Sequence, residues 1–419
     1  MGKSITSLLK IQGWFKVLDI KEEKSTLHLY LKQMRKTTIC PVCLKRTKTG
    51  YDIQSERAIL HTRIGKQLLF LHISPRRFIC PCRKDKPFIE RLPGITGKRR
   101  STQQFDSEVI DSLSGQSFKT VERKLSLTYP AVRSRLEALV DPGSLRWDAL
   151  SDLSEIHLGL DGHHLVGRRF VETVAEVKHG IPLGILPGVT KAIIAKGLKS
   201  CPSYLREKVK SVNSDMDDGV IAVAKEIFPN AVIVIDKFHL VQDAGKRLND
   251  ARLIEQEIVN QERAKKRMGR IDIPIQLFRL AKEHLHEDEK QKLEDLFKQY
   301  PRLKIWYAAK ERLRDVYTEK TRDNAQVKLQ GLILMLSVQD DAELILWGKS
   351  LKYYKEDILN HFIYRTTNAY TEGLHVRCKL VQRLSCGFRN ADVYIRKALL
   401  MLLPLSVIVS HKLYPQYLS

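Results

Sequence analysis

The stretch Glu155-Ile156-His157-Leu158-Gly159-Leu160-Asp161 has the composition of a short buried strand and ends in an acid. Short apolar runs bounded by turn residues are typical of strands in a packed sheet. The elements expected after it are two strands joined at His179-Gly180, a helix, a strand, a helix and a strand: residues 169–177, 181–186, 191–198, 209–215, 219–228 and 231–235. The strand at 209–215 repeats the opening pattern, because it also ends in an acid, Asp215.

Three antiparallel strands followed by helix, strand, helix and strand is the order of the RNase-H-like fold. In that fold the first and fourth strands are neighbours, so Asp161 and Asp215 would end adjacent strands. Two carboxylates buried together are costly without a cation, and their oxygens suit a divalent metal. We therefore predict that both bind metal for phosphoryl transfer. Taken singly each would be a cap or turn residue, and Asp217 and Asp218 compete with Asp215, which we prefer because it ends the apolar strand.

A third carboxylate is expected from a helix much later in the chain. The segment 366–373 supplies Glu372, just before a basic helical stretch with Arg377, Lys379 and Arg383. These cations would lie where a phosphate backbone must pass. Considered alone, Glu372 is equally well explained as a surface glutamate near a helix start.

The charge balance points to a polyanionic partner. Lysine and arginine number 72 against 48 acidic residues, which gives a net charge of +24. Basic clusters recur at Lys98-Arg99-Arg100, at Lys265-Lys266-Arg267 and across 377–383. Such clusters favour phosphate contact and nucleic acid binding. A merely basic protein or a ribosome-associated factor is the alternative.

We expect no membrane segment, because no run approaches the roughly 18 to 20 apolar residues that a span requires. Lys3, Lys10 and Gln12 interrupt any apolar stretch after Met1, so no signal peptide is expected either. The predicted location is the cytoplasm, in association with the nucleoid.

Four of the seven cysteines lie in the first quarter of the chain. Cys40 and Cys43 form one knuckle, and Cys80 and Cys82 form a tighter one with a single residue between the thiols. In a reducing compartment, four thiolates from two turns predict a closed, structural Zn²⁺ site. Strand-like alternation at 58–61 and 67–73 indicates a zinc-stapled β module over about 36–92. A metal-free β domain is the alternative, and His61 and His72 are substitute ligands.

Helical spacing begins at Phe105 and breaks at Ser126-Leu127-Thr128. This pattern predicts a helix-turn-helix whose second helix, 129–140, carries Arg133 and Arg135 toward a DNA major groove. A helical hairpin without a DNA role is the alternative. A linker follows at Asp141-Pro142-Gly143-Ser144.

Residues 244–364 have helical character almost throughout and predict an all-helical insertion between the second and third acids. An independent helical partner-binding domain would show the same periodicity. The fold class is therefore α/β: an RNase-H-like mixed sheet with a helical insertion, preceded by a zinc-binding β module and a helix-turn-helix. The expected domains are residues 1–97, 98–145, 150–243, 244–364 and 365–419.

These segments together resemble the ISL-three family of bacterial insertion-sequence transposases. The resemblance rests on four ordered stretches: the 40–82 module with 76–78 and 88–93; Asp161-Gly162; Asp215-Met216 with 228–231 and 236–239; and 368–380 with Arg383 and 387–390. It departs from the family pattern at His375, where Asn often follows the Glu-Gly pair, and in the shortened second knuckle.

The resemblance implies a DDE transposase with Asp161, Asp215 and Glu372 as the catalytic triad. These acids would hold Mg²⁺ or Mn²⁺, with Asp236 and His239 in an auxiliary role. The expected partners are double-stranded DNA, as terminal inverted repeats and target, and a second copy of the chain in a dimer or larger assembly. A DNA-binding regulator and a nuclease of the same fold are the alternatives.

Overall fold

The computed structural model describes residues 9, 11, 13–84, 86–92, 94–95, 100–142, 145–165 and 169–404. Lys98 and Arg99 of the first basic cluster and Gly143-Ser144 of the expected linker lie outside these residues. The chain divides into two compact units, one formed by 1–141 with 378–419 and the other by 142–377. Among the described helices, none combines the length and apolar character needed to cross a bilayer.

The first unit contains a four-stranded sheet in the order β1-β2-β7-β6. Its strands are β1 Phe15–Glu22, β2 Thr26–Gln33, β6 Arg57–Ile64 and β7 Gln67–Ile73. Alternating apolar residues of this sheet, such as Leu29, Leu69 and Leu71, form a small separate core. The sheet therefore begins at Phe15, ahead of the module that the cysteine spacing predicts from about residue 36.

Short strands beside this sheet carry the cysteines. They are β3 Thr38–Ile39, β4 Arg46–Thr47, β5 Gly50–Ile53, β8 Arg76–Phe78 and β9 Phe88–Ile89, with the 3₁₀ helix η1 at Pro81–Arg83. β3 pairs with β4, and β5, β8 and β9 form a three-stranded sheet. Such small sheets bury little apolar surface, so they depend on a further cross-link.

Four helices complete the first unit: α2 Gln103–Gly115, α3 Phe118–Leu125, α4 Tyr129–Leu139 and α17 Ala391–Leu402. The turn between α3 and α4 passes through Ser126, whose φ is 52°. α17 packs against α2 and α4. Its Lys397 Nζ donates to the Gln116 carbonyl over 2.7 Å. This last helix lies in the compact unit that also contains α2, α3 and α4.

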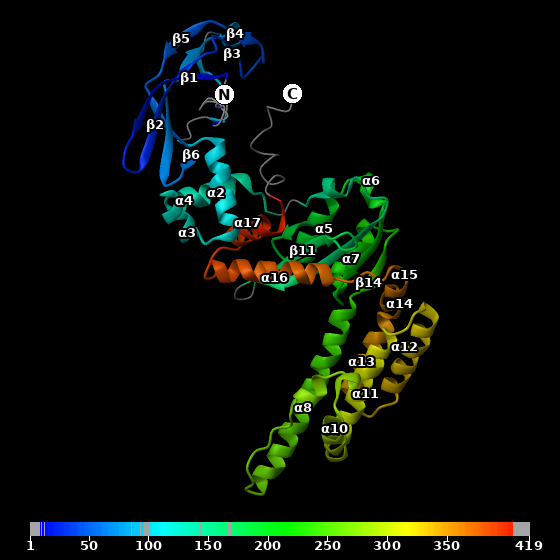
Figure 1. Ribbon diagram of the computed structural model, residues 1–419. Helices are drawn as coiled ribbons and strands as arrows, with labels where there is room; N and C mark the ends of the chain where they lie inside the picture. The colour runs from blue at the N-terminus through cyan, green and yellow to red at the C-terminus, as the bar shows by residue number, and fades with distance from the viewer. Residues whose placement is uncertain are drawn as a thin grey trace. The chain divides into compact units, whose positions relative to one another are not determined.

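The second unit is built on a mixed five-stranded sheet in the order β12-β11-β10-β13-β14. Its strands are β10 Ile156–His164, β11 Phe170–Glu176, β12 Ile181–Leu186, β13 Val209–Ser214 and β14 Val232–Ile235. β13 pairs in parallel with both β10 and β14. β11 pairs antiparallel with both β10 and β12. The expected strand ending at Asp161 is longer than predicted, since β10 continues to His164 as the partner of β11. Figure 1 labels β11 and β14 of this sheet.

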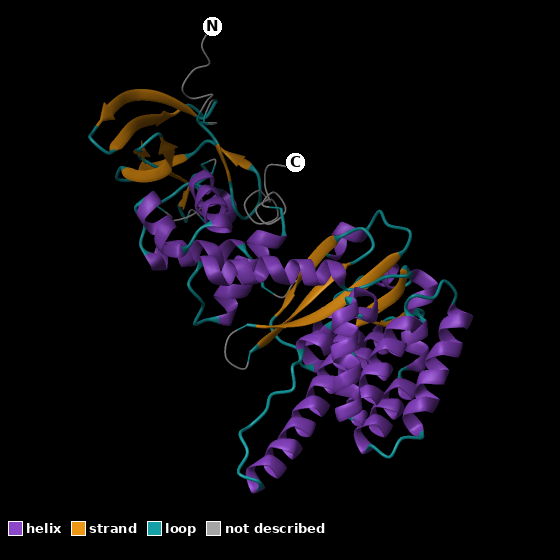
Figure 2. Ribbon diagram, turned by 60° about the horizontal axis from the view of Figure 1, so that its bottom comes forward, coloured by secondary structure: helices purple, strands orange, loops and turns teal. Residues whose placement is uncertain are grey.

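Helices α5 Lys191–Lys199, α6 Ser203–Arg206 and α7 Asp218–Ile227, with the 3₁₀ helix η2 at Trp147–Leu150, accompany this sheet. α5 packs on α7, and their apolar residues join those of the strands in one core. Figure 2 shows the twisted strands of the sheet with helices packed beside them. The order of elements agrees with the segments expected at 169–235.

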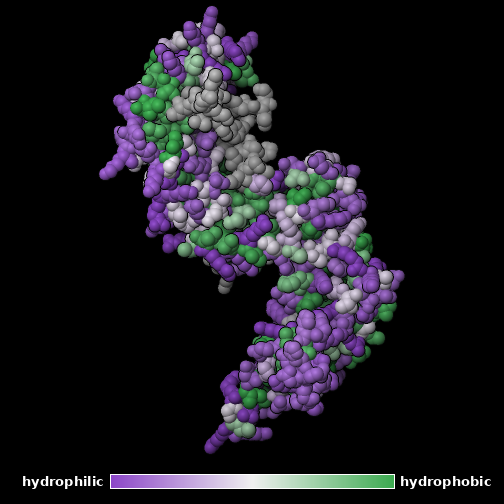
Figure 3. Space-filling model, in the orientation of Figure 1, coloured by the Kyte–Doolittle hydropathy of each residue, from purple (hydrophilic) through white to green (hydrophobic). Residues whose placement is uncertain are grey.

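A long helix, α8 Lys237–Lys265, leaves the sheet and starts a helical region. The region continues through α9 Gln276–Arg279, η3 Lys282–His284, α10 Glu287–Gln299, α11 Pro301–Val316, α12 Arg322–Ser337, α13 Ala342–Tyr353, α14 Lys355–Leu359 and α15 His361–Tyr364. The boundary expected at residue 244 falls inside α8, which runs through it unbroken. Hydrophilic residues dominate the visible surface of this region (Figure 3). The chain then enters α16 Ala369–Leu384.

Candidate active site and cysteine centre

Asp161 and Asp215 lie on neighbouring parallel strands. β10 and β13 are paired through Gly159 and Asn213, and each acid stands two residues beyond that pair. Because side chains alternate along a strand, residues two positions apart point to the same face. Both carboxylates therefore converge, and their oxygens lie within 4.8 Å of each other and of a ring nitrogen of His239.

His239 stands between these two acids. Its Nε2 lies 3.5 Å from Asp161 Oδ1 and 3.1 Å from Asp215 Oδ1. Asp236 fixes the residue in place, because it caps α8 and its Oδ2 accepts the backbone N–H groups of Phe238 and His239 at 3.1 and 3.4 Å. The imidazole thus occupies the position where a cation would neutralise both carboxylates.

Glu372 joins the same cluster from the first turn of α16. A carboxylate oxygen of Glu372 lies within 4.8 Å of ligand atoms of Asp236 and His239. His239 is therefore common to two groups, one with Asp161 and Asp215 and one with Asp236 and Glu372. The structure brings all five of these acids and bases to one place, although they are far apart in the chain.

The loop before α16 is pinned to the sheet by buried hydrogen bonds. The backbone N–H of Asn368 donates to Asp236 Oδ1 at 2.9 Å, and its side-chain Nδ2 donates to the Leu160 carbonyl at 3.0 Å. The Thr366 hydroxyl donates to Asn213 Oδ1 at 2.9 Å. These bonds fix the start of α16 against β10 and β13, and so fix the position of Glu372.

Gly159 makes this close approach possible. A Cβ atom at this position would lie 2.4 Å from Val177 Cγ1 and 2.7 Å from Asn368 Oδ1. Only a residue without a side chain lets Asn368 lie over β10. The glycine in the middle of the opening strand is therefore a packing requirement of the site.

The electrostatics of the cluster favour a bound cation. Asp161 Oδ2, Asp215 Oδ1 and Glu372 Oε1 are buried oxygens without a hydrogen-bond partner among the residues that the structure describes. Burial and the charges of Asp161 and Asp236 outweigh His239 and raise the pKa of Asp215 to about 6. Burial and the charge of Asp236 raise the pKa of Glu372. Uncompensated buried carboxylates of this kind are typical of metal and catalytic sites.

The same surroundings stabilise the charged form of the His239 imidazole. Burial lowers the pKa of His239, but the carboxylates of Asp161, Asp215 and Asp236 outweigh it and raise that pKa to about 9. At neutral pH the ring is therefore positively charged while it lies between the acids. A divalent cation would supply the same compensation with more charge.

Sequence reasoning did not single out Glu172 or Thr173 near the site, and it named His375 only as a departure from the family pattern. Glu172, on β11, is a buried carboxyl whose pKa is raised well above its ordinary value by burial and by the charges of Asp161, Asp215 and Asp217. His375 lies 3.4 Å from Asp161 Oδ2 through Nδ1, and its Nε2 lies 3.2 Å from the Thr173 hydroxyl. The register of β11 against β10 places Thr173 opposite Asp161. In the sequence, only the alternation of side chains along β11 could have indicated that Thr173 lies near the site.

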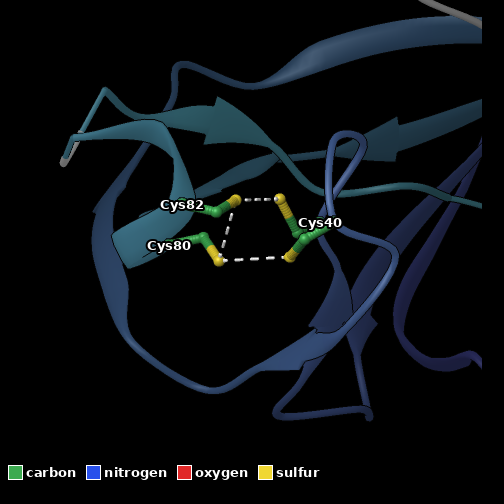
Figure 4. Close-up of side chains that lie close together, drawn as sticks. Cys40, Cys80 and Cys82 are labelled. Carbon is green, nitrogen blue, oxygen red and sulfur yellow. Dashed lines mark hydrogen bonds between the residues drawn. The ribbon is translucent and has the colours of Figure 1, made fainter.

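The four N-terminal cysteines form a second cluster. Sγ of Cys40 lies 3.5 Å from that of Cys82, Cys43 lies 3.7 Å from Cys80, and Cys80 lies 3.5 Å from Cys82. All four sulfurs lie within 4.8 Å of one another. Figure 4 shows the Cys40, Cys80 and Cys82 side chains pointing toward a common centre. Tetrahedral Zn²⁺ with bonds of about 2.3 Å requires sulfurs about 3.8 Å apart, so the thiols fit such an ion.

Two tight turns present these thiols. In the first, the Cys40 N–H donates to the Lys45 carbonyl and Leu44 adopts a φ of 58°. In the second, η1 follows Cys80 directly. Although burial opposes it, the Cys43 and Val42 N–H groups and neighbouring thiols lower the pKa of Cys40 to about 6. The alternative ligands lie elsewhere: His61 contacts Thr102, and His72 contacts His28.

The cations expected to contact DNA differ in availability. The Arg135 guanidinium is already hydrogen-bonded within the protein, because its Nε donates to buried Asp106 over 2.7 Å and its Nη2 donates to Ser101. It therefore holds α4 against α2 instead of extending into solvent. Arg133 is half-exposed beside Glu137, its ion-pair partner one turn later. The remaining cations lie at exposed positions of α16: Arg377, Lys379 and Arg383.

Comparison with known proteins identifies the family. A family model described as a transposase, of the ISL-three DDE type, matches residues 158–398 and so covers the whole carboxylate cluster. The transposase for insertion sequence element IS1001 of Bordetella parapertussis is 23% identical over 376 residues, which cover 89% of this chain and 90% of that protein. The transposase for IS1557 of Mycobacterium tuberculosis is 22% identical over 362 residues, covering 81% and 80%.

These matches confirm the resemblance that the ordered motifs indicated. They extend along most of the chain, and the matched region contains Asp161, Asp215 and Glu372. The chain belongs to the ISL-three family of DDE transposases.

Proposed function

We propose that this transposase binds the terminal inverted repeats of an insertion sequence and catalyses metal-dependent cleavage and strand transfer of their DNA. The observation that carries the proposal is the convergence of Asp161, Asp215 and Glu372 around His239, with buried oxygens that lack a hydrogen-bond partner among the described residues. The sheet order, with two parallel strands carrying the first two acids, supports an RNase-H-like core.

Asp161, Asp215 and Glu372 would hold Mg²⁺ or Mn²⁺, since carboxylate oxygens are the ligands that these hard ions prefer. When bound, a metal pair activates the attacking oxygen and stabilises the leaving oxygen of a phosphodiester. Asp236 has a positioning role, because it caps α8 and holds Asn368. His239 neutralises the acids before metal binds, which fits the auxiliary role expected for it.

Hydrolysis of the strand at the element end would come first and leave a 3′-hydroxyl. That hydroxyl would then attack target DNA in line, with the exposed Arg377, Lys379 and Arg383 on the phosphate backbone. Cys40, Cys43, Cys80 and Cys82 would hold Zn²⁺ as a structural ion, because four thiolates leave no open position.

The zinc module and the helices α3 and α4 would recognise the terminal repeats, with Arg133 at the DNA surface. Joining two ends in one event requires a dimer or larger assembly, with residues 244–364 as the candidate region for holding a partner or a strand. The DNA substrate would place this activity in the cytoplasm, at the nucleoid.

The test uses labelled terminal-repeat DNA, a target plasmid and Mg²⁺. Wild-type protein should cut at the element end and yield joined product. Asp161→Asn should abolish both reactions and retain DNA binding, whereas Asp152→Asn, an exposed aspartate outside the cluster, should behave as wild type. Loss of binding in a folded Asp161→Asn protein would contradict the assignment.

The same assay separates the alternatives. A regulator would shift the DNA without cutting it, and a nuclease of the same fold would cut without producing joined product. Omission of the divalent ion should stop both steps of the transposase reaction and leave binding in place.

A further inference from the structure

A pocket opens directly beside the carboxylate cluster. It has a volume of about 320 Å³ and is lined by the start of α8, the end of α11 and the start of α16. Two of its lining residues, Asp236 and Glu372, belong to the cluster itself. Any ligand in this pocket would therefore be attached to, or adjacent to, the group on which the cluster acts.

The wall of the pocket is aromatic and apolar. Phe238 and Val241 line it from α8, and Ala369 lines it from α16. Phe238 is 51% exposed, although it stands between Asp236, which is 1% exposed, and half-buried His239. Its ring meets the His239 ring edge to face at 5.6 Å between centroids. An exposed aromatic ring held rigidly at a helix start is a ready stacking surface.

Positive charge lies at the same pocket. Lys237 and Arg314 are both lining residues. Arg314 is ion-paired with Glu283 and Glu311. Exposed Lys237 has no acidic partner within the described part of the chain, and its ammonium group lies 5.6 Å from the centre of the Tyr317 ring. The apolar lining residues lie next to a cation without an acidic partner among the described residues and next to the carboxylate cluster, so the pocket offers contacts for both the base and the phosphate of a nucleotide.

We propose that this pocket receives one unpaired nucleobase next to the scissile phosphate, stacked on Phe238, with Lys237 on a neighbouring phosphate. The proposal rests on the proposed function, because the base belongs to the DNA strand that the carboxylate cluster cuts. Stacking accepts any base, since every base has a π face. A base still paired in a duplex cannot enter a pocket, so one base pair at the cleavage position must open first.

The first test compares two terminal-repeat substrates after the cleavage position has been mapped with wild-type protein. One substrate is fully paired, and the other is mismatched at the two base pairs that flank the cleavage position. Phe238→Ala should cut the paired substrate about tenfold more slowly, because it loses one stacking contact. It should cut the mismatched substrate within about twofold of wild type, because the opening is already made.

Two variants serve as controls. Phe238→Tyr keeps the ring and should restore the cleavage of the paired substrate that Phe238→Ala loses. Phe170→Ala removes a comparably exposed ring, 46% exposed, on β11 outside the pocket, and should also behave as wild type. Because Phe238 is exposed, its replacement should leave the thermal unfolding midpoint unchanged, which separates the effect from misfolding.

A second readout detects base opening without cleavage. A thymine placed in the complementary strand, opposite the base that enters the pocket, loses its pairing partner and should react with permanganate in the wild-type complex when Ca²⁺ replaces Mg²⁺, and should stay protected in the Phe238→Ala complex. Equal cleavage of both substrates by wild type and Phe238→Ala, or a thymine that never becomes reactive, would overturn the proposal. Absence of cleavage of either substrate by wild-type protein would instead contradict the proposed function.

Discussion

The cysteine centre and the carboxylate cluster are both suited to metal, but they are built in opposite ways. The cysteine centre draws four equivalent thiols from two turns within residues 40–82, and their sulfurs enclose a single point. The carboxylate cluster collects Asp161, Asp215 and Glu372 from three distant segments and leaves buried oxygens without a hydrogen-bond partner among the described residues. A closed set of ligands stabilises a fold, whereas an open one leaves room for a substrate.

The surroundings of the two clusters follow the same division. The cysteines sit among two-residue and three-residue strands that have little apolar core of their own. The acids rest on a five-stranded sheet with a large core. Metal at the first cluster should therefore affect folding, and metal at the second should affect chemistry.

The largest expected effect is on the cysteine centre. Chelation of Zn²⁺, or Cys40→Ser, should unfold the short strands around it, because a structural zinc site contributes on the order of 10 kcal/mol to folding. Circular dichroism and metal analysis of the purified protein measure this loss. Cys386→Ser, at an exposed cysteine outside the cluster, should retain one equivalent of metal and the wild-type spectrum. Unchanged stability after complete metal removal would show that the thiols form a metal-free core.

A substitution in the carboxylate cluster should change the rate of strand cleavage and leave folding intact. Glu372→Gln should reduce strand cleavage by roughly 10²- to 10³-fold or more, because it removes a charged group that stabilises the reacting phosphate. Its thermal midpoint should stay at or above that of wild type, since a buried charge is lost. Glu343→Gln, also in the first turn of a helix, is the matched control and should cleave normally. A Glu372→Gln protein of full activity would remove this residue from the site.

A substitution at Gly159 should affect both the stability of the protein and the rate of cleavage. Gly159→Ala should destabilise the second unit by about 1–3 kcal/mol, because its Cβ would overlap Val177 and Asn368. Cleavage should fall further than this loss explains, since Asn368 positions the start of α16. Denaturant unfolding and cleavage rates measured together test the claim. Gly245→Ala, in α8 with open space around it, should be neutral or slightly stabilising.

The smallest effect is on pH dependence. Asp215 has a pKa of about 6 in the metal-free protein, above its ordinary value of 3.8, so a proton competes with metal below about pH 6. The Mn²⁺ concentration for half-maximal cleavage should rise about tenfold for each pH unit below that value. Between about pH 6 and pH 9 a weaker dependence should remain, because the charged His239 ring stands where the metal would bind. Zinc content, measured in the same samples, should not follow this profile.

Local patterns predicted much of this structure. Apolar runs and the turn at Gly180 placed β11, β12 and β13 within a residue or two, because strand periodicity is a property of adjacent residues. The cysteine spacing indicated the turns for the same reason. The placement of Asp215 followed from the end of β13.

Long-range packing explains what local patterns missed. Most residues of β1 are exposed and most residues of β2 are half-buried, so neither strand shows a clear alternation in sequence. Asp161 lies inside β10 because β11 extends the pairing past it. The roles of Asn368 and Gly159 depend on a contact between segments about two hundred residues apart. The bond between Arg135 and Asp106 joins two helices, so no local pattern indicates it.

One consequence concerns the length of α8. His239 stands in its first turn, and the same helix runs without a break to Lys265, a rod of about 43 Å at ~1.5 Å per residue. The part of α8 nearest the site is anchored by three buried side chains, those of Leu240, Ala244 and Leu248. Farther along, the Arg252 side chain donates a hydrogen bond to the Ile273 carbonyl. The helix that carries the imidazole among the acids therefore also carries residues about 40 Å away, so a partner bound at its distal end would contact the same helix as the site.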